Sequence, residues 1–113
     1  MSQITTHVLD TTRGLPAQNL PIVLYKQSSN DWEKLAEGVT NSDGRIAGLL
    51  ADDLVLPAGI YRMHFETAPY FDANEEAGFY PYVDIVFELD GSDSHYHIPL
   101  LLTAYGYSTY RGS

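Results

Sequence analysis

Short segments in which hydrophobic and polar residues alternate run through the whole sequence, and turn-forming residues separate each segment from the next. The clearest is residues 82–89, in which Val83, Ile85, Phe87 and Leu89 occupy every second position. A period of two places successive side chains on opposite faces of a β-strand, so these four side chains are expected on one face. Because the segments are short and regularly interrupted, the pattern predicts a fold built from β-sheets.

About eight strands are expected, together with one short helix of at most about two turns, which is below the length at which a helix is stable alone. This number of short strands in a chain of 113 residues predicts an all-β fold, a two-sheet β-sandwich, as a single domain over residues 1–113. The expected helix is residues 72–78, and the expected strands are residues 3–10, 21–26, 32–37, 45–50, 60–67, 82–89, 95–102 and 105–111.

The charge and cysteine content narrow the kinds of partner and site. The formal net charge is −9, from 15 acidic and 6 basic side chains, which disfavours binding to nucleic acid or to an anionic membrane. There is no cysteine, so neither disulfides nor thiolate metal sites can form. The first residues show no signal-peptide pattern, and no apolar run reaches the roughly 20 residues of a membrane helix, so a cytoplasmic location is expected.

The chain has four histidines, which are the natural candidates for proton transfer near neutral pH. In the first strand His7 is expected on the same face as Thr5. His95 and His97 are two residues apart and share a face if their segment is a strand, but spacing alone does not show that this face meets His7. An ordinary surface or hydrogen-bonded histidine is the usual alternative, and His64 is interpreted as structural. A zinc site on His95 and His97 is a rival, although the spacing indicates no third ligand.

Two other residues are candidates for the functional site, although each could equally be an ordinary residue without a chemical role. Arg45 follows a turn and is either a surface arginine or a fixed cation for a planar, oxygen-rich ligand. Ser113 is the last residue, and a terminal serine is in most proteins a hydroxyl without a role. No serine lies in a G-x-S-x-G elbow, and neither a phosphate-binding loop nor a dinucleotide-binding glycine pattern is present.

Three stretches resemble the transthyretin-like family, in order and with compact spacing over nearly the whole chain. The first is ITTHVLD (residues 4–10) followed by GLPA (residues 14–17), and the second is TNSDGR (residues 40–45). The third, HYHIPLL (residues 95–101) leading to YGYSTYRGS (residues 105–113), resembles the signature of the hydrolase branch. Thr103-Ala104 stands where the family usually has Ser-Pro, in an expected turn between the last two strands.

The resemblance implies an enzyme that opens the ring of 5-hydroxyisourate, a product of urate oxidation, to an imidazoline carboxylate without a cofactor or metal. It implies a homotetramer, a dimer of dimers, with the sites at a subunit interface. It implies that His7, Arg45, His97 and Ser113 are catalytic, with Tyr110 joining His7 and Arg45 in substrate binding. By the same resemblance His97 rather than His95 belongs to the site, and which histidine is the general base stays open.

Two rival functions are weighed against the hydrolase. A non-catalytic, small-molecule binding protein of the same fold is the first alternative, and the presence of His7, Arg45 and His97 together with the terminal YRGS sequence argues against it. A zinc-dependent hydrolase that uses His7, His95 and His97 is the second, and chelation would test it.

Overall fold

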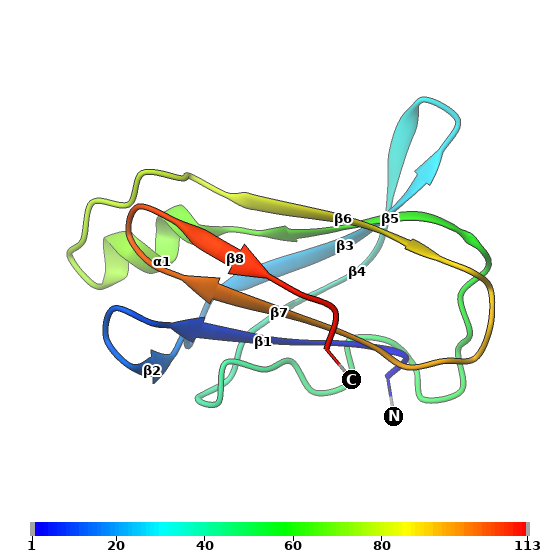
Figure 1. The fold of residues 1–113 in the computed structure, drawn as a ribbon, viewed down its shortest axis with the longest axis horizontal. Coiled ribbons are helices and arrows are strands. Elements are labelled where there is room, and N and C mark those ends of the chain that lie inside the picture. The colour runs from blue at the N-terminus through cyan, green and yellow to red at the C-terminus, as the bar shows by residue number, and fades with distance from the viewer. Residues whose placement is uncertain (1, 113) are drawn as a thin grey trace.

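The computed structural model describes residues 2–112, which fold into two facing β-sheets with one helix at the end of the sandwich (Figure 1). Each sheet has four strands, in the orders β2-β1-β7-β8 and β4-β3-β5-β6. This confirms the predicted two-sheet sandwich. The elements are β1 (Ile4–Asp10), β2 (Leu15–Pro16), β3 (Pro21–Ser28), β4 (Asp31–Val39), β5 (Gly59–Phe65), α1 (Thr67–Ala73), β6 (Val83–Leu89), β7 (Tyr96–Leu102) and β8 (Tyr107–Thr109).

The core lies between the two sheets and follows from the alternation in the sequence. In β1 buried and half-buried residues alternate strictly, with Ile4 and Val8 facing inward and Thr5, His7 and Leu9 facing outward. This confirms the expected faces of the first strand. The largest fully buried side chains come from both sheets and from the loop before β3: Ile4, Val8, Leu20, Ile22, Leu24, Tyr61, Met63, Phe65, Val83, Leu89, Leu100 and Leu102.

β1 and β7 pair in parallel, whereas the other neighbouring strands are antiparallel. In the β1–β7 register Thr5 is opposite His97 and His7 is opposite Pro99. The outward-facing residues of the first strand therefore lie beside the outward-facing residues of a strand near the end of the chain. The histidine-bearing segments become neighbours in this way.

The expected strand at residues 45–50 is wrong, because this segment forms turns apart from a single β-bridge between Arg45 and His7. Gly44 and Gly48 adopt positive φ angles of 74° and 67°, which interrupt an extended backbone. Leu49 and Leu50 are both buried, although consecutive residues of a strand point to opposite faces. Conversely, Leu15–Pro16, expected in a loop, forms the short strand β2 on the edge of β1.

The helix is real but begins five residues before the expected one, at Thr67 rather than at residue 72. Its buried side chains, Thr67, Tyr70 and Phe71, follow helical spacing and pack onto the end of the core. The helix ends near Asn74, and Glu75 has a φ of 57°, a left-handed conformation common after a helix. Burial of aromatic side chains therefore decided the helix position, rather than the Glu and Ala residues that follow.

The turn between β7 and β8 is where the sequence places it. The backbone N–H of Thr103 donates to the carbonyl of Gly106 over 2.9 Å, and the Thr103 hydroxyl donates to the same carbonyl over 3.1 Å. Thr103 thus closes the turn at the position where the resemblance would place a serine hydroxyl. β8 itself is shorter than expected, because only Tyr107–Thr109 pairs with β7.

Candidate active site

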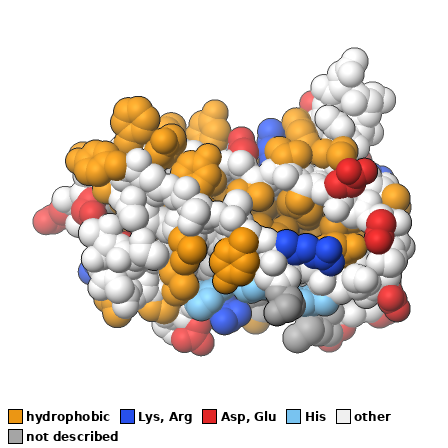
Figure 2. Space-filling model, viewed as in Figure 1, with side chains coloured by type: hydrophobic (Ala, Val, Ile, Leu, Met, Phe, Trp, Pro, Cys, Tyr) orange, Lys and Arg blue, Asp and Glu red, His pale blue; other side chains and the backbone are white. Residues whose placement is uncertain are grey.

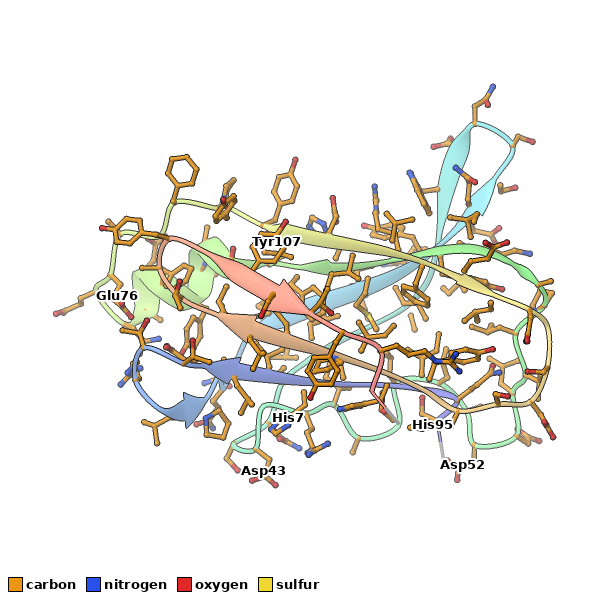
Figure 3. The ribbon with its side chains drawn as sticks, viewed as in Figure 1. His7, Asp43, Asp52, Glu76, His95 and Tyr107 are labelled. Carbon is orange, nitrogen blue, oxygen red and sulfur yellow. The ribbon has the colours of Figure 1, made fainter. Side chains whose placement is uncertain are left out.

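The candidate site lies on the outer face of the β1–β7 pair. Thr5 and His7 project from β1, His97 projects from β7, and His95 immediately precedes β7. Figure 3 shows His7 on the outer side of β1 near the loop that carries Asp43, and His95 toward the other end of the strand. Figure 2 shows histidine side chains (pale blue) and a basic side chain gathered along the same rim.

Arg45 is placed by a tightly clamped loop. The Asn41 side-chain oxygen accepts hydrogen bonds from the backbone N–H groups of Asp43 and Arg45, over 2.9 and 3.1 Å. The backbone N–H of Val8 then donates to the carbonyl of Gly44 over 2.8 Å, which fixes the loop against β1. A Cβ atom on Gly44 would come within 2.3 Å of the Val8 carbonyl oxygen, so glycine is required there. The loop therefore places Arg45 beside His7, with which it forms a β-bridge.

The end of the chain lies against His97. The backbone N–H of Gly112 donates to the His97 carbonyl over 2.8 Å, and these two residues form a β-bridge. A Cβ atom at Gly112 would lie 2.6 Å from Cδ2 of the imidazole ring, so this position holds the ring only if it is glycine. The predicted site residue Ser113 lies outside the described residues.

Arg45, His95 and His97 line an open cleft of ≈ 460 Å³. His7 flanks the cleft through its bridge to Arg45. The lining residues are Thr5, Thr6, Asn41, Arg45, Ile46, Ala47, His95 and His97. The structure thus brings His7, Arg45 and His97 together, although they are far apart in the sequence.

Tyr110 lies on the other side of His97. It lines a neighbouring cavity of ≈ 220 Å³ together with His97 and Arg111, and its side chain is exposed. The Arg111 guanidinium lies 4.8 Å from the centre of the Tyr96 ring, a cation–π contact that holds this part of the chain against β7. His97 is the residue that the two cavities share.

Thr5 was not singled out in the sequence analysis, although it contacts two of the histidines. Its hydroxyl oxygen lies 2.8 Å from Nδ1 of His97 and 3.0 Å from Nε2 of His95. The signal that could have identified it is its position two residues before His7, on the same face of β1.

The surroundings of His7 and His97 keep both imidazole rings neutral. Burial lowers the pKa of His7 below 6.5, and the positive charge of Arg45 lowers it further. Burial likewise lowers the pKa of His97, with additional lowering by Arg45, His7 and His95. Both imidazoles are therefore unprotonated at neutral pH, the form in which a histidine accepts a proton from water.

These shifts predict the pH dependence of a reaction that uses either histidine as a base. Activity should be full at neutral pH and fall as the pH drops, with a midpoint below the ordinary histidine value of 6.5. The Arg45→Ala variant should shift this midpoint upward, because the opposing positive charge is removed. Profiles of kcat/KM against pH for both proteins measure this, and a midpoint unaffected by Arg45 would contradict it.

His64 is remote from this cleft. It lies on β5, and its ring nitrogens contact Asp84 and Glu66, each over 2.5 Å. Its surroundings are thus a surface network on the other sheet. Among residues 2–112 no group of three or more histidine, cysteine or acidic side chains is arranged to hold a metal ion.

Comparison with known proteins places this geometry in a family. Residues 4–112 match the model of the HIUase/Transthyretin family. The chain is 43% identical to the 5-hydroxyisourate hydrolase of Mus musculus over 114 residues, covering 99% of this chain and 96% of the relative.

Two solved structures share the fold. The 5-hydroxyisourate hydrolase of Klebsiella pneumoniae superposes with a TM-score of 0.85 at 36% identity, covering 97% of this chain and 98% of the other. Sea bream transthyretin, solved with thyroxine, superposes with a TM-score of 0.91 at 27% identity, covering 98% of this chain and 95% of the other. The extent of the family match and the identity to its hydrolases together show that this chain belongs to the HIUase/Transthyretin family.

Proposed function

We propose that the chain is a hydrolase that opens the ring of 5-hydroxyisourate. The observation that carries the proposal is the meeting of His7, Arg45 and His97 around one cleft, with both histidines held neutral. Relatives that bear this enzyme's name match nearly the full chain, at about the same identity in animals and bacteria. A fold shared with transthyretin alone would not account for a base and a cation in the same place.

The proposed reaction begins with water, a poor nucleophile at neutral pH. A neutral imidazole, of His7 or His97, removes a proton as the water oxygen bonds to a ring carbonyl carbon of the substrate. Such assistance contributes roughly 10² to 10⁴ in rate. The carbonyl π electrons move onto oxygen, which gives a tetrahedral intermediate with a negative charge.

Arg45 supplies the charge that this intermediate needs. Its guanidinium offers several N–H donors in one plane, which suits both the substrate's carbonyl oxygens and the developing oxyanion. Collapse of the intermediate breaks the ring C–N bond, and the protonated imidazole returns its proton to the leaving nitrogen. The product is a ring-opened carboxylate, and the balance of atoms requires only water. Tyr110 and the Ser113 hydroxyl are proposed to orient the substrate by hydrogen bonds.

The direct test uses substrate made in the cuvette from urate by urate oxidase. Adding the protein should speed the loss of 5-hydroxyisourate absorbance well beyond its spontaneous decay, in proportion to protein concentration. An unchanged decay at micromolar protein would reject the proposed function. Equal rates before and after prolonged chelation are expected, whereas loss on chelation with rescue by zinc would favour the metal-dependent alternative.

Variants of Arg45 test whether the planar guanidinium, with its paired N–H donors, is needed for activity. We expect Arg45→Lys to lower kcat/KM about tenfold, because the charge is kept but paired hydrogen bonds are lost, and Arg45→Ala to lower it by about 10²-fold. Steady-state kinetics on folded variants measure both losses. Equal activity of the lysine variant and the wild type would show that only diffuse charge matters.

The alternative is a non-catalytic protein that binds a small molecule, which the likeness to sea bream transthyretin with thyroxine motivates. It predicts saturable binding of an aromatic ligand with no acceleration of 5-hydroxyisourate decay. The two functions are therefore separated by the same decay assay, run with a binding measurement in parallel.

The family also motivates a proposal about assembly, a homotetramer formed as a dimer of dimers. In this chain β6 and β8 are the edge strands on one side of the sandwich, and edge strands leave backbone hydrogen-bonding groups unpaired. Exposed Val86 and Tyr107 lie on these two strands. Light scattering coupled to size-exclusion chromatography should report four times the chain mass of 12.6 kDa.

Across residues 2–112, no helix has the length and apolar character needed to cross a membrane. The cytoplasmic location stays a prediction from the sequence.

A further inference from the structure

A threonine hydroxyl joins two histidines beside the candidate cleft. Thr5 Oγ1 is within hydrogen-bond distance of Nδ1 of His97, at 2.8 Å, and of Nε2 of His95, at 3.0 Å. The two rings reach the hydroxyl because Thr5 is opposite His97 in the β1–β7 register. We propose that Thr5 is a positioning residue that couples the protonation of His97 to that of His95, so that the two histidines act as one proton-handling unit. The proposal rests on the proposed function and deepens it.

The coupling follows from the number of hydrogens available. A hydroxyl has one proton to donate, whereas a neutral imidazole has one N–H and one lone pair. If Nδ1 of His97 donates to Thr5, then Thr5 donates to Nε2 of His95. The reverse chain runs from Nε2 of His95 through Thr5 to Nδ1 of His97. The state of one ring therefore sets the state of the other.

The first chain prepares His97 as a base. With the proton on Nδ1, the lone pair of His97 is on Nε2, the ring nitrogen that Thr5 does not bind. This nitrogen is then free to accept a proton from water. The hydrogen bond to the far nitrogen decides which nitrogen of a histidine reacts, and here the Thr5 hydroxyl provides that bond.

The groups that line the spaces beside the two rings differ in charge. His97 faces the cation Arg45 as well as His7, and both oppose a positive charge on its ring. His95 borders a second hollow, of ≈ 350 Å³, that Asp52, Asp53 and Asp93 also line. Figure 3 shows Asp52 and His95 at the same end of the sandwich.

The remaining lining of this hollow, from Ser2, Gln3, Leu54 and Val55, carries no titratable side chain. On the cleft side, the charged or titratable groups of the lining and flank are Arg45, His97 and His7, with Asp43 beside His7. Glu88 and Arg111 line the neighbouring cavity that His97 shares. The relay therefore runs from a cleft that holds Arg45 to a hollow that three aspartates line.

The transfer is balanced in protons. Nε2 of His97 takes one proton from water as the water oxygen bonds to the substrate. Nδ1 of His97 passes its proton to Thr5 Oγ1, and the original hydroxyl proton of Thr5 moves to Nε2 of His95. His97 is then neutral with its proton on Nε2, and His95 carries the positive charge. As Nε2 of His97 gives this proton to the leaving nitrogen, the chain reverses: Nε2 of His95 returns a proton to Thr5, and the hydroxyl proton of Thr5 moves to Nδ1 of His97. Both rings therefore end neutral, in the resting arrangement.

Two substitutions at Thr5 separate the hydroxyl from the shape of the side chain. Thr5→Val keeps the β-branched shape and removes the hydroxyl, and we expect kcat to fall about tenfold with KM changed less than about twofold. Thr5→Ser keeps the hydroxyl and should restore most of the rate. Equal losses in the two variants, or no loss in Thr5→Val, would overturn the proposal.

His95→Gln tests proton acceptance by the second ring. The glutamine amide can still accept a hydrogen bond from Thr5 but cannot take a proton. We expect a loss of about tenfold in kcat, and the double variant with Thr5→Val should be no slower than either single variant. Losses that multiply would mean that the two residues act independently, against the proposed unit.

Thr11→Val is the matched control. Its hydroxyl contacts the Leu102 carbonyl over 3.3 Å, between the same two strands but at their other end. The substitution has the same size and the same loss of an inter-strand hydrogen bond, and it should leave kcat within about twofold of the wild type. A drop equal to that of Thr5→Val would assign the effect to strand pairing and overturn the relay.

A measurement without substrate separates this proposal from the proposed function. Long-range ¹H–¹⁵N spectra report which ring nitrogen carries the proton, and in the wild type both His97 and His95 should carry it on Nδ1. In Thr5→Val this preference should be lost for both rings. Unchanged spectra would reject the coupling even if the enzyme is active. A protein that shows the coupling but does not accelerate 5-hydroxyisourate decay would instead reject the proposed function.

Discussion

Replacing His97 or His7 with asparagine is expected to lower kcat by at least about 10²-fold while the sandwich stays folded. Asparagine keeps a polar side chain of similar reach but cannot accept a proton from water. Both histidines project outward from their strands and do not belong to the core between the sheets, so their loss removes no core packing. Rapid kinetics with freshly generated 5-hydroxyisourate measure the loss.

The control for this pair is His64→Gln. His64 lies on β5 of the other sheet and contacts Asp84 and Glu66, so its substitution should leave kcat near the wild-type value. Wild-type activity in a well-folded His7→Asn or His97→Asn protein would remove that residue from the mechanism. A kcat that falls only for one of them would identify the base.

Deleting residues 110–113 is expected to abolish hydrolysis with a smaller loss of stability than removal of a core strand. The deletion removes Gly112, whose backbone is bonded to His97, and leaves the buried side chains of β7 in place. Circular dichroism and size-exclusion chromatography check the fold and assembly, and the decay assay checks activity. A folded, tetrameric and fully active truncated protein would show that this segment has no role in the site.

Gly112→Ala refines the same test without shortening the chain. The added methyl group would meet His97 Cδ2 at 2.6 Å, so the imidazole ring must move away from Thr5 or the chain end must lift from β7. Either movement should lower kcat strongly while the melting temperature changes little. Gly14 differs from Gly112 in that a Cβ atom there would meet nothing within 4 Å. Its positive φ would nevertheless strain any substitution.

The sandwich could be predicted because the alternation in strands such as β1 and β6 reports directly which side chains face the core. That His7 shares a face with Thr5 followed from that pattern and is confirmed, and the structure shows that this face is the outer one. The segment 45–50 could not be read in this way, because consecutive hydrophobic residues suit either a buried strand or a turn that packs on the core. The position of the helix depended on where Tyr70 and Phe71 find burial, which is a tertiary property.

The residue pattern alone could not show which residues come together in the site. Nothing in the spacing indicates that β1 and β7 lie side by side in parallel, and the contact between His7 and Arg45 depends on a glycine turn docking on Val8. Resemblance to the family suggested that proximity, and in the structure His7 pairs with Arg45, which lines one cleft with His97. Thr5 was missed because a threonine on a strand carries no chemical signal until its neighbours are known.

The parallel pairing of β1 and β7 has a consequence for the time course of folding. The hydrogen bond between the side chains of Thr5 and His97 joins residues that are 92 positions apart in the chain. Nearly the whole chain must therefore be enclosed in a loop before the cleft exists. Closing such a loop costs more entropy than closing a local hairpin such as β3–β4, and chains dominated by distant contacts fold slowly. We therefore expect secondary structure in the hairpins to form ahead of the cleft, so that recovered activity marks the completion of the fold rather than its beginning.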